Sequence, residues 1–426
     1  MVVKVSASDI QTAAAERYEA DLQLLKTWVR INSGTHHVAG NREQLHTIAE
    51  RFAALPGSGR IEEFEHPADD TDVDTYRACY VHRCRPEAPV QVLLNGHVDT
   101  VFDASHPFQD VTLLDAQHLR GPGVTDMKGG IVILLASLEL FETFADAELR
   151  ANLGWEVLLT CDEEIGSVHS RPLLERAAER NHLGITFESS LPDGKLVRRR
   201  MGVGYGHARV TGLSAHAGRN FHDGRNAIVK LCDWVQKIHA LNHTLDGVIV
   251  NTGSMQGGGP LNVVSDHAEA RFNLRVQDQI AEQALFQALE RIHSEIQESG
   301  YTCEWHARLN RRAKEAGPAF DALFEAWQRA ASVQGELLDW CDTGGGSDGN
   351  LLEAFGLPII DNLGMMGQHI HSSNEVALLP SLTSRSCLVT TFLLMLSAGE
   401  FDALLDGPFA QKLRALQQAC TTLTTP

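Results

Sequence analysis

Three apolar segments of the chain each lead directly to a polar residue that could carry chemistry. They are residues 90–95 before His97, residues 155–160 before Glu163, and residues 183–187 before Glu188. These strand-like segments alternate with helical patterns such as residues 127–144, which is typical of an α/β layer with mostly parallel strands. Open α/β sheets bind ligands at the carboxyl edge of their strands. We therefore expect the three side chains to converge at one edge of a sheet.

The alternation of strands and helices changes at about residue 200. Segments with strand or helix patterning then follow in the order β-α-β-β-α-β, at residues 206–212, 224–241, 248–254, 268–276, 278–298 and 301–309. This order predicts a small ferredoxin-like α+β sandwich. The 426 residues exceed the usual size of a single core, so two domains are expected. We predict an α/β/α catalytic domain with a mostly parallel sheet from residues 1–199 and 313–426, interrupted by an inserted α+β domain at residues 200–312.

Composition and charge exclude several classes of partner. The formal net charge of −19 argues against a nucleic-acid partner, which would favour a basic surface. The longest apolar runs, residues 131–138 and 388–396, are too short to span a bilayer. Residues 1–16 lack the pattern of a signal peptide, and the eight cysteines form no Cys-x-x-Cys pair. We therefore expect a cytoplasmic protein that binds neither nucleic acid nor membranes.

Two short motifs indicate a metal site. The first is His97-x-Asp99, and the second is the glycine-rich turn at residues 121–130, which carries Asp126 into an apolar helix. Zinc binds imidazole nitrogen and carboxylate oxygen, and two metals roughly 3.5–4 Å apart can activate one water between them. An imidazole cannot bridge two ions, whereas a carboxylate can. Asp126 suits that role because glycines let the backbone approach closely.

Each of these residues also has a purely structural interpretation. His-x-Asp can be a hydrogen-bonded surface pair, Glu163-Glu164 a solvated face, Asp126 a helix N-cap, and His371 a buried structural histidine. The combination favours a metal centre. Five potential ligands lie at strand or helix ends of one α/β layer, in the order His, Asp, Glu, Glu, His.

The motifs together resemble the dizinc peptidase and deacylase family. They are GHVDT at 96–100, GPGVTDMKGG at 121–130, DEEIGS at 162–167 and HSSNE at 371–375. This family contains bacterial glutamate carboxypeptidase, acetylornithine deacetylase, succinyl-diaminopimelate desuccinylase and the aminoacylases. The resemblance covers nearly the whole chain, and TGGGSD at 343–348 looks most like the glutamate carboxypeptidase branch.

The resemblance implies a role for each motif residue. Two Zn²⁺ per subunit would be held by His97, Glu164, Glu188, His371 and the bridging Asp126. Co²⁺ or Mn²⁺ would also suit these mixed nitrogen and oxygen ligands. Asp99 would orient the imidazole of His97, and Glu163 would be the general base. A cis peptide bond is expected between Asp126 and Met127.

Two ligand assignments have alternatives in the sequence. His369 lies two residues before His371 and competes with it, although the Ser-Ser-Asn-Glu that follows favours His371. Glu188 is followed by Ser-Ser, where the family often has proline.

The inserted domain resembles the family's dimerisation (lid) domain, which implies a homodimer. His216 would then reach the active site of the partner subunit and stabilise the oxyanion, although it could also be an ordinary loop histidine. Asn262 and Arg275 would bind the substrate carboxylate, for which the arginine fork is suited, with a simple surface charge as the alternative for Arg275. Gly346, in the loop at 344–348, would help to bind substrate.

The sequence therefore predicts a zinc-dependent hydrolase that cleaves an amide bond next to a free carboxylate. The substrate would be a small molecule or peptide, and the reaction would be of the glutamate carboxypeptidase type with release of a C-terminal amino acid. One alternative is an N-acyl-amino-acid deacylase or aminoacylase. Another is a non-catalytic, metal-stabilised binding protein. The intact Glu163 argues against it, because a site without catalytic activity needs no general base.

Overall fold

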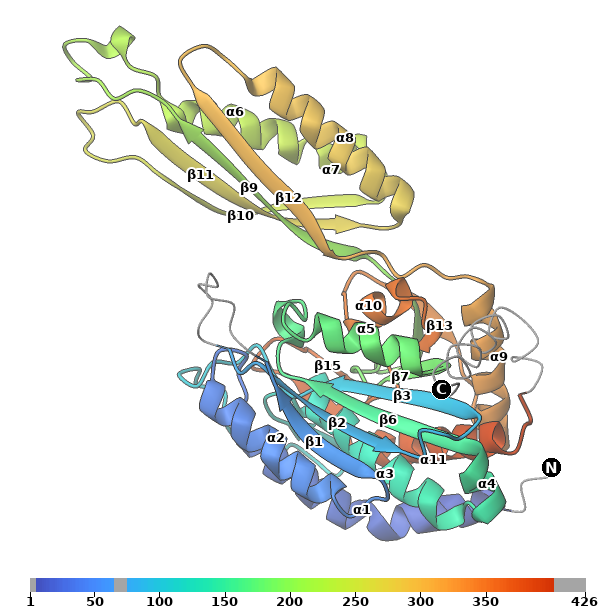
Figure 1. The fold of residues 1–426 in the computed structure, drawn as a ribbon. Helices are drawn as coiled ribbons and strands as arrows, with labels where there is room; N and C mark the ends of the chain where they lie inside the picture. Colours follow the sequence, from blue (N-terminus) through green and yellow to red (C-terminus); the bar gives the residue numbers. More distant parts are fainter. Residues whose placement is uncertain (1–4, 65–74, 402–426) are drawn as a thin grey trace, which may run out of the picture. The chain divides into compact units, whose positions relative to one another are not determined.

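The computed structural model describes residues 5–64 and 75–401. The chain forms two compact units (Figure 1). Unit 1 contains Met1–Arg198, Ala316–Asp342 and Ser347–Pro426, and unit 2 contains Arg199–Glu315 and Thr343–Gly346. Unit 2 is thus inserted between two segments of unit 1, and a short loop near residue 345 also belongs to it.

Unit 1 is built on a six-stranded mixed sheet. Its strands lie in the order β1 (Ser58–Glu63), β2 (Ala78–Cys84), β6 (Leu153–Thr160), β3 (Val90–His97), β7 (Leu183–Thr186) and β14 (Ile359–Ile360). β6, β3, β7 and β14 are mutually parallel, and β1 and β2 are antiparallel to their neighbours. β6 is buried along its whole length, as expected of a strand covered on both faces.

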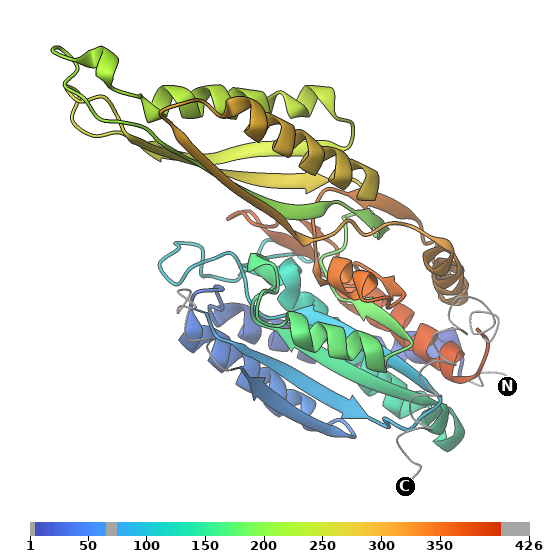
Figure 2. The same cartoon turned by 45° about the horizontal axis from the view of Figure 1, so that its top comes forward.

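Helices cover both faces of this sheet (Figure 2). One layer consists of α1 (Ala7–Arg30), α2 (Val38–Phe52), α3 (Gly129–Phe144), α9 (Pro318–Val333) and α11 (Pro380–Ser397), which share one large apolar core. On the other face, α5 (Arg171–Arg180) and α10 (Asp348–Ala354) pack against β2, β3 and β6 through a separate core. α4 (Ala147–Asn152) precedes β6. The predicted α/β/α architecture with a mostly parallel sheet is confirmed.

A second, smaller sheet brings distant segments of unit 1 together. Its order is β15 (Gly367–Gln368), β16 (Val376–Leu378), β5 (His118–Arg120) and β4 (Thr112–Leu113), and all its pairs are antiparallel. Leu119 pairs with Ala377, so the turn after β5 lies beside the turn before β16. Where the chain passes between the units, β8 (Leu196–Arg200) pairs with β13 (Trp340–Thr343).

Unit 2 is a four-stranded antiparallel sheet with helices on one face. The strand order is β10 (Val248–Gly257), β11 (His267–Val276), β9 (Gly202–Thr211) and β12 (Thr302–Arg311). α6 (Ala227–His239) and α8 (Gln279–Ile296) pack on one face and share its apolar core, and the short α7 (Leu241–Thr244) follows α6. The expected β-α-β-β-α-β order is therefore present.

The helix predicted at residues 127–144 begins later in the structure. Residues Val124–Lys128 form a distorted turn in which Asp126 (φ −114°, ψ 89°) and Met127 (φ −135°, ψ 35°) leave helical geometry. Regular helix starts at Gly129. Apolar periodicity could not reveal this boundary, because Met127 is as buried as the helix that follows.

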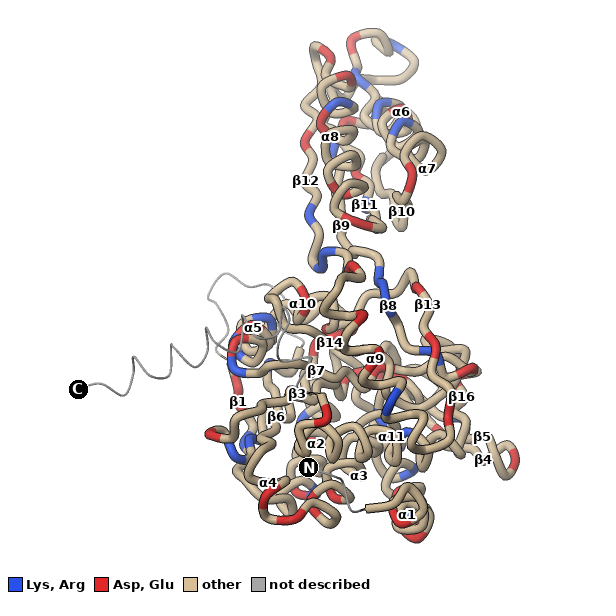
Figure 3. The backbone as a smooth tube through the Cα atoms, turned by 90° about the vertical axis from the view of Figure 1, so that its right-hand side faces the viewer, with Lys and Arg blue, Asp and Glu red and all other residues tan. Residues whose placement is uncertain are grey.

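Acidic side chains are in excess but do not gather in one place. Asp and Glu outnumber Lys and Arg by 55 to 36 in the full chain, and both signs are interspersed over each unit (Figure 3). Within residues 5–64 and 75–401, no helix combines the length and apolar character needed to cross a membrane.

Candidate metal centre and active site

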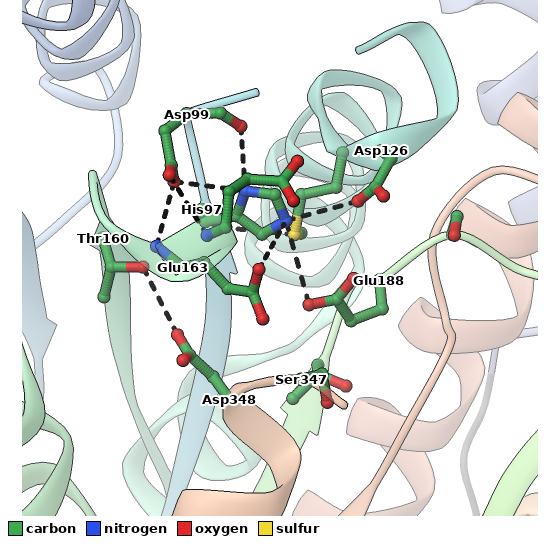
Figure 4. A network of polar contacts seen from close by, with 12 residues as sticks. His97, Asp99, Asp126, Thr160, Glu163, Glu188, Ser347 and Asp348 are labelled. Carbon is green, nitrogen blue, oxygen red and sulfur yellow. Dashed lines mark hydrogen bonds and ion pairs between the residues drawn. The ribbon is translucent and has the colours of Figure 1, made fainter. Parts of the chain in front are cut away.

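The predicted ligands in unit 1 meet at the carboxyl edge of the large sheet. His97 is the last residue of β3, Glu188 follows β7 by two residues, and Glu164 lies in a single 3-10 turn after β6. Asp126 comes from the distorted turn before α3, and His371 from the turn between β15 and β16. Figure 4 shows the imidazole of His97 facing carboxylates that reach it from three of these segments.

The side chains form two groups that share one aspartate. One group is His97, Asp126 and Glu188, and the other is Asp126, Glu164 and His371; within each group the ligand atoms lie within 4.8 Å of one another. Asp126 Oδ1 is 3.3 Å from His97 Nε2, and Asp126 Oδ2 is 3.2 Å from His371 Nε2. Each carboxylate oxygen therefore faces a different histidine, which is the arrangement required of a bridging ligand.

Glu163 lies beside these groups and belongs to neither. Its Oε2 is 4.0 Å from His97 Nε2, and the side chain is buried. His369 is exposed and likewise belongs to neither group, so the structure places His371 at the centre. Glu188 lies 3.8 Å from His97 Nε2 although serine replaces the proline expected after it.

Unsatisfied polar atoms at the centre fit a bound cation. His97 Nε2 and Asp126 Oδ1 are buried; they face each other at 3.3 Å, but neither makes a hydrogen bond among the described residues. Such atoms are rare in folded proteins and call for a ligand. Imidazole and carboxylate donors of this kind suit zinc, and also cobalt or manganese.

The electrostatics of the metal-free residues point the same way. Hydrogen bonds to Asp126 and Glu164 raise the pKa of His371 to about 11. Burial, reinforced by the charge of Asp126, raises the pKa of Glu164 to about 7 despite its contact with His371. Crowded, desolvated carboxylates resist ionisation unless positive charge is nearby. A divalent cation in each group would supply it.

Asp99 has contacts that its sequence position did not predict. Its carboxylate accepts hydrogen bonds from the backbone N–H groups of Glu163 and Glu164, both at 3.2 Å, and from Thr35 Oγ1 at 2.9 Å. Nδ1 of His97 lies 3.4 Å from this carboxylate and makes its hydrogen bond, at 3.0 Å, with the backbone oxygen of Asp99. Asp99 therefore holds the loop of the expected base as well as the imidazole.

Two further buried carboxylates near the site were missed in the sequence. Asp348, at the start of α10, accepts a hydrogen bond from the hydroxyl of Thr160 before the Glu163 loop (Figure 4). It accepts another from the hydroxyl of Ser167 after that loop. Glu375 accepts three backbone hydrogen bonds from the turn that carries Asp126. Glu375 is the last residue of the HSSNE motif. The sequence does not reveal that its carboxylate is buried, so its role could not be recognised there.

The backbone of the Asp126 turn has two special features. The peptide bond between Asp126 and Met127 is cis, as the resemblance implied. Gly123 adopts φ 70°, and a Cβ there would lie 2.7 Å from a methyl group of Thr100. Glycine is therefore required at this position on two grounds, conformation and space.

The remaining predicted site residues belong to unit 2. His216 and Asn262 are exposed and lie in adjacent loop segments, where Ala217 N–H donates to the backbone oxygen of Asn262. Arg275 on β11 is partly buried; its Nε donates to Asn273 Oδ1 at 2.9 Å and its Nη1 to Gly344 O at 3.3 Å. Gly346 lies in the same loop as Gly344. The roles of these residues towards substrate stay predictions.

Comparisons with known proteins agree with this geometry. The sequence model described as Peptidase family M20/M25/M40 matches residues 93–394. Carboxypeptidase G2 from Pseudomonas sp. (strain RS-16) is 27% identical over 316 residues, which cover 72% of this chain and 74% of that protein. A succinyl-diaminopimelate desuccinylase from Halorhodospira halophila is 26% identical over 381 residues, covering 84% and 93% of the two chains.

Solved structures share the fold. A tripeptidase from Staphylococcus aureus superposes with a TM-score of 0.74 at 20% identity, covering 89% of this chain and 99% of that one. Human carnosine dipeptidase 1 gives a TM-score of 0.70 at 15% identity, with 93% and 100% coverage. The family model spans well over half of the 426 residues and includes both groups of candidate ligands. This chain therefore belongs to peptidase family M20/M25/M40 and is a metal-dependent amidohydrolase.

Proposed function

We propose that this protein is a dinuclear zinc hydrolase that cleaves an amide bond next to a free carboxylate, in the manner of a glutamate carboxypeptidase. The observation that carries the proposal is the arrangement of carboxylates at the edge of the sheet. Asp126 presents one oxygen to each of two ligand groups, while the carboxylate of Glu163 lies beside them and belongs to neither. A site that only stored metal would need no such additional carboxylate.

The residues of the chain then have separate tasks. His97, Glu188, Glu164, His371 and Asp126 would hold the two ions, which when bound supply Lewis acidity and lower the pKa of water. Glu163 takes a proton from the attacking water and delivers it to the leaving amine, as a general base and then a general acid. Asp99 keeps the backbone of Glu163 fixed during both transfers. His216 from a partner subunit would stabilise the oxyanion.

Recognition of the substrate carboxylate is assigned to unit 2. Arg275 is half-buried, and no carboxylate pairs with it among the described residues, so its guanidinium is available to an anionic ligand. Asn273 and the oxygen of Gly344 hold this guanidinium in place. Asn262 and Gly346 would add polar contacts. On this proposal unit 1 is the catalytic domain, and unit 2 is the lid and dimerisation domain.

We also propose that the protein is a homodimer formed through unit 2. β10 is an edge strand, and its Ile249 is 51% exposed. On α6, Val229 is 65% exposed. An unpaired strand edge beside exposed apolar side chains is typical of an interface between copies. Size-exclusion chromatography with light scattering would measure the molar mass of the protein in solution. A monomer at micromolar concentration would contradict the proposal.

An N-acyl-amino-acid deacylase is the second candidate. Its support is that the desuccinylase from Halorhodospira halophila matches a larger share of this chain than the carboxypeptidase does, at nearly the same identity. Both candidates share the attacking water, the base and the carboxylate next to the cleaved bond. They differ in the group on the acyl side, which is an amino-acid residue in one case and a simple acid in the other.

One substrate panel separates the candidates. The zinc-loaded protein is incubated with dipeptides, N-acyl-glutamates and other N-acyl amino acids, each as the free acid and as the C-terminal amide, and the released amine is measured. The proposal expects hydrolysis of free acids, with C-terminal glutamate preferred, and little turnover of the matched amides. Equal rates for acids and amides would contradict a carboxylate requirement, and a preference for simple acyl groups would favour the deacylase.

A further inference from the structure

We propose that Glu375 is a positioning residue that fixes the bridging Asp126 and thereby determines how tightly the Asp126–Glu164–His371 position holds its metal. This inference rests on the proposed dinuclear centre. Glu375 is not a candidate ligand, since it belongs to neither of the two groups. It acts through the backbone of the turn that presents Asp126.

The carboxylate of Glu375 collects three backbone donors of that turn. Its Oε1 accepts from the N–H groups of Thr125 at 2.8 Å and Asp126 at 3.1 Å, and its Oε2 accepts from that of Gly123 at 3.0 Å. The side chain is fully buried, at 0% exposure. Burying a carboxylate is unfavourable unless hydrogen bonds compensate it, so these three bonds are a strong constraint on the turn.

The turn needs this constraint because regular α-helical hydrogen bonding does not hold it. Wider i→i−5 bonds span it instead, from Lys128 N–H to Gly123 O at 2.9 Å and from Gly129 N–H to Val124 O. Asp126 and Met127 depart from helical φ and ψ, and regular helix begins only at Gly129. A residue with a free backbone could rotate its carboxylate away from either histidine. Because Glu375 binds the N–H of Asp126 itself, it holds the backbone from which the Asp126 carboxylate reaches both ligand groups.

A second buried ionisable side chain anchors the other end of the same turn. Lys128 is 1% exposed and donates from Nζ to the backbone oxygens of Trp28 at 3.2 Å and Ile31 at 2.6 Å, at the carboxyl end of α1. A cation is favourable at the carboxyl end of a helix, where carbonyl groups lack partners. The turn that carries Asp126 is therefore held by the side chain of Glu375 up to Asp126 and by the side chain of Lys128 after it.

Glu375 also connects Asp126 to His371. It lies four residues after His371, and its own N–H donates to Ser372 O at 3.0 Å, which closes the intervening turn. Its backbone oxygen accepts from Gly121 N–H at 3.3 Å. His371 is otherwise weakly supported, with its side chain 51% exposed and its backbone at φ 60°.

The two metal positions should therefore depend on Glu375 to different degrees. His97 sits at the end of a buried strand and keeps its position without Glu375. At the position that includes His371, Glu375 connects the backbones of two of the three candidate ligands, Asp126 and His371. Loss of this carboxylate should weaken that position more than the position that includes His97.

The test uses the full-length protein with Co²⁺ as the probe, because its visible spectrum reports coordination geometry. Glu375→Gln keeps the size but loses one acceptor oxygen, and Glu375→Ala loses both. Glu156→Gln is the matched control, since Glu156 is 1% exposed, pairs with Arg180 and belongs to neither ligand group. Metal-free protein is titrated with Co²⁺, and zinc content is measured after dialysis.

We expect wild type and Glu156→Gln to bind two ions with the same spectrum. Substitution of residues that orient metal ligands typically weakens affinity about 10- to 100-fold. In Glu375→Gln the affinity of the weaker of the two Co²⁺-binding steps should fall by that factor, and the visible spectrum should change. Glu375→Ala should retain about one ion per chain. Unchanged affinity and spectrum in both variants would overturn the inference.

Two further results keep the inference separate from folding and from the proposed function. In metal-free wild type, the amides of Gly123, Thr125 and Asp126 should resist hydrogen exchange, because the carboxylate of Glu375 accepts them before metal arrives. Rapid exchange at these three amides would overturn the inference even if both variants fail to fold. If the variants lose one ion but no amide substrate is cleaved by wild type, the inference stands and the proposed substrate class fails. A wild type that binds one ion at saturation would contradict both.

Discussion

The carboxylate of Asp99 accepts the backbone N–H of Glu163 at 3.2 Å. One side chain therefore joins the segment of the first histidine ligand to the segment of the expected base. The neighbouring N–H of Glu164 bonds to the other oxygen of the same carboxylate, also at 3.2 Å. These two hydrogen bonds fix the backbone of Glu163 and Glu164. The expected base and the candidate metal ligand, although adjacent in sequence, can therefore keep separate positions at the site.

The first prediction concerns Glu163 as the base. Glu163→Gln should keep both metals, because the residue lies outside both ligand groups, while kcat falls by about 10²- to 10⁴-fold, the usual contribution of general base catalysis. Metal analysis and steady-state kinetics measure the two effects. Glu164→Gln is the comparison and should lose metal as well as activity. Substantial turnover by the Glu163→Gln variant would exclude Glu163 as the base.

The second prediction concerns the bridge. Asp126→Asn replaces one of the two oxygens that face His97 and His371 with a neutral amide nitrogen, which cannot bind a cation. Occupancy of both positions should therefore fall to a similar degree, in contrast to the Glu375 variants, in which the position that includes His371 is expected to weaken more than the other. Zinc content after dialysis against a weak chelator reports the result. Two tightly bound ions in this variant would show that Asp126 does not bridge.

The third prediction concerns recognition of the substrate carboxylate. Arg275→Ala should raise KM for substrates with a free carboxylate and leave the metal content unchanged, because the residue belongs to unit 2 and to neither ligand group. Arg271→Ala is the matched control, since Arg271 lies on the same strand and its side chain is 70% exposed. Equal effects of the two substitutions would reduce Arg275 to a surface charge.

The fourth prediction concerns protons and metal. In the metal-free protein, hydrogen bonds to Asp126 and Glu164 raise the pKa of His371 to about 11, so this imidazole is protonated at pH 7. A metal ligand must be deprotonated, so binding must release that proton, and affinity must fall as the pH is lowered. Calorimetry in buffers of different ionisation enthalpy measures the released protons. Binding without proton release at pH 7 would contradict His371 as a ligand.

Local sequence patterns were sufficient for the architecture and for most candidate ligands. His97 and Glu188 follow apolar strands, and parallel strands place their carboxyl ends at one edge, so periodicity alone predicted that they converge. The motif resemblance added His371, which no periodic pattern would distinguish from His369. The α+β insertion was predicted from the order β-α-β-β-α-β of its elements, because each strand and helix has its own apolar periodicity in the sequence.

Only the tertiary structure decided what holds these ligands. Glu375 binds a turn about 250 residues earlier in the chain, through the pairing of β16 with β5. Such a contact depends on how two strands far apart in the sequence pair within one sheet, and neither periodicity nor spacing encodes it. The sequence by itself determined which residues could bind metal, and the packing of distant segments determined the direction in which Asp126 presents its two oxygens.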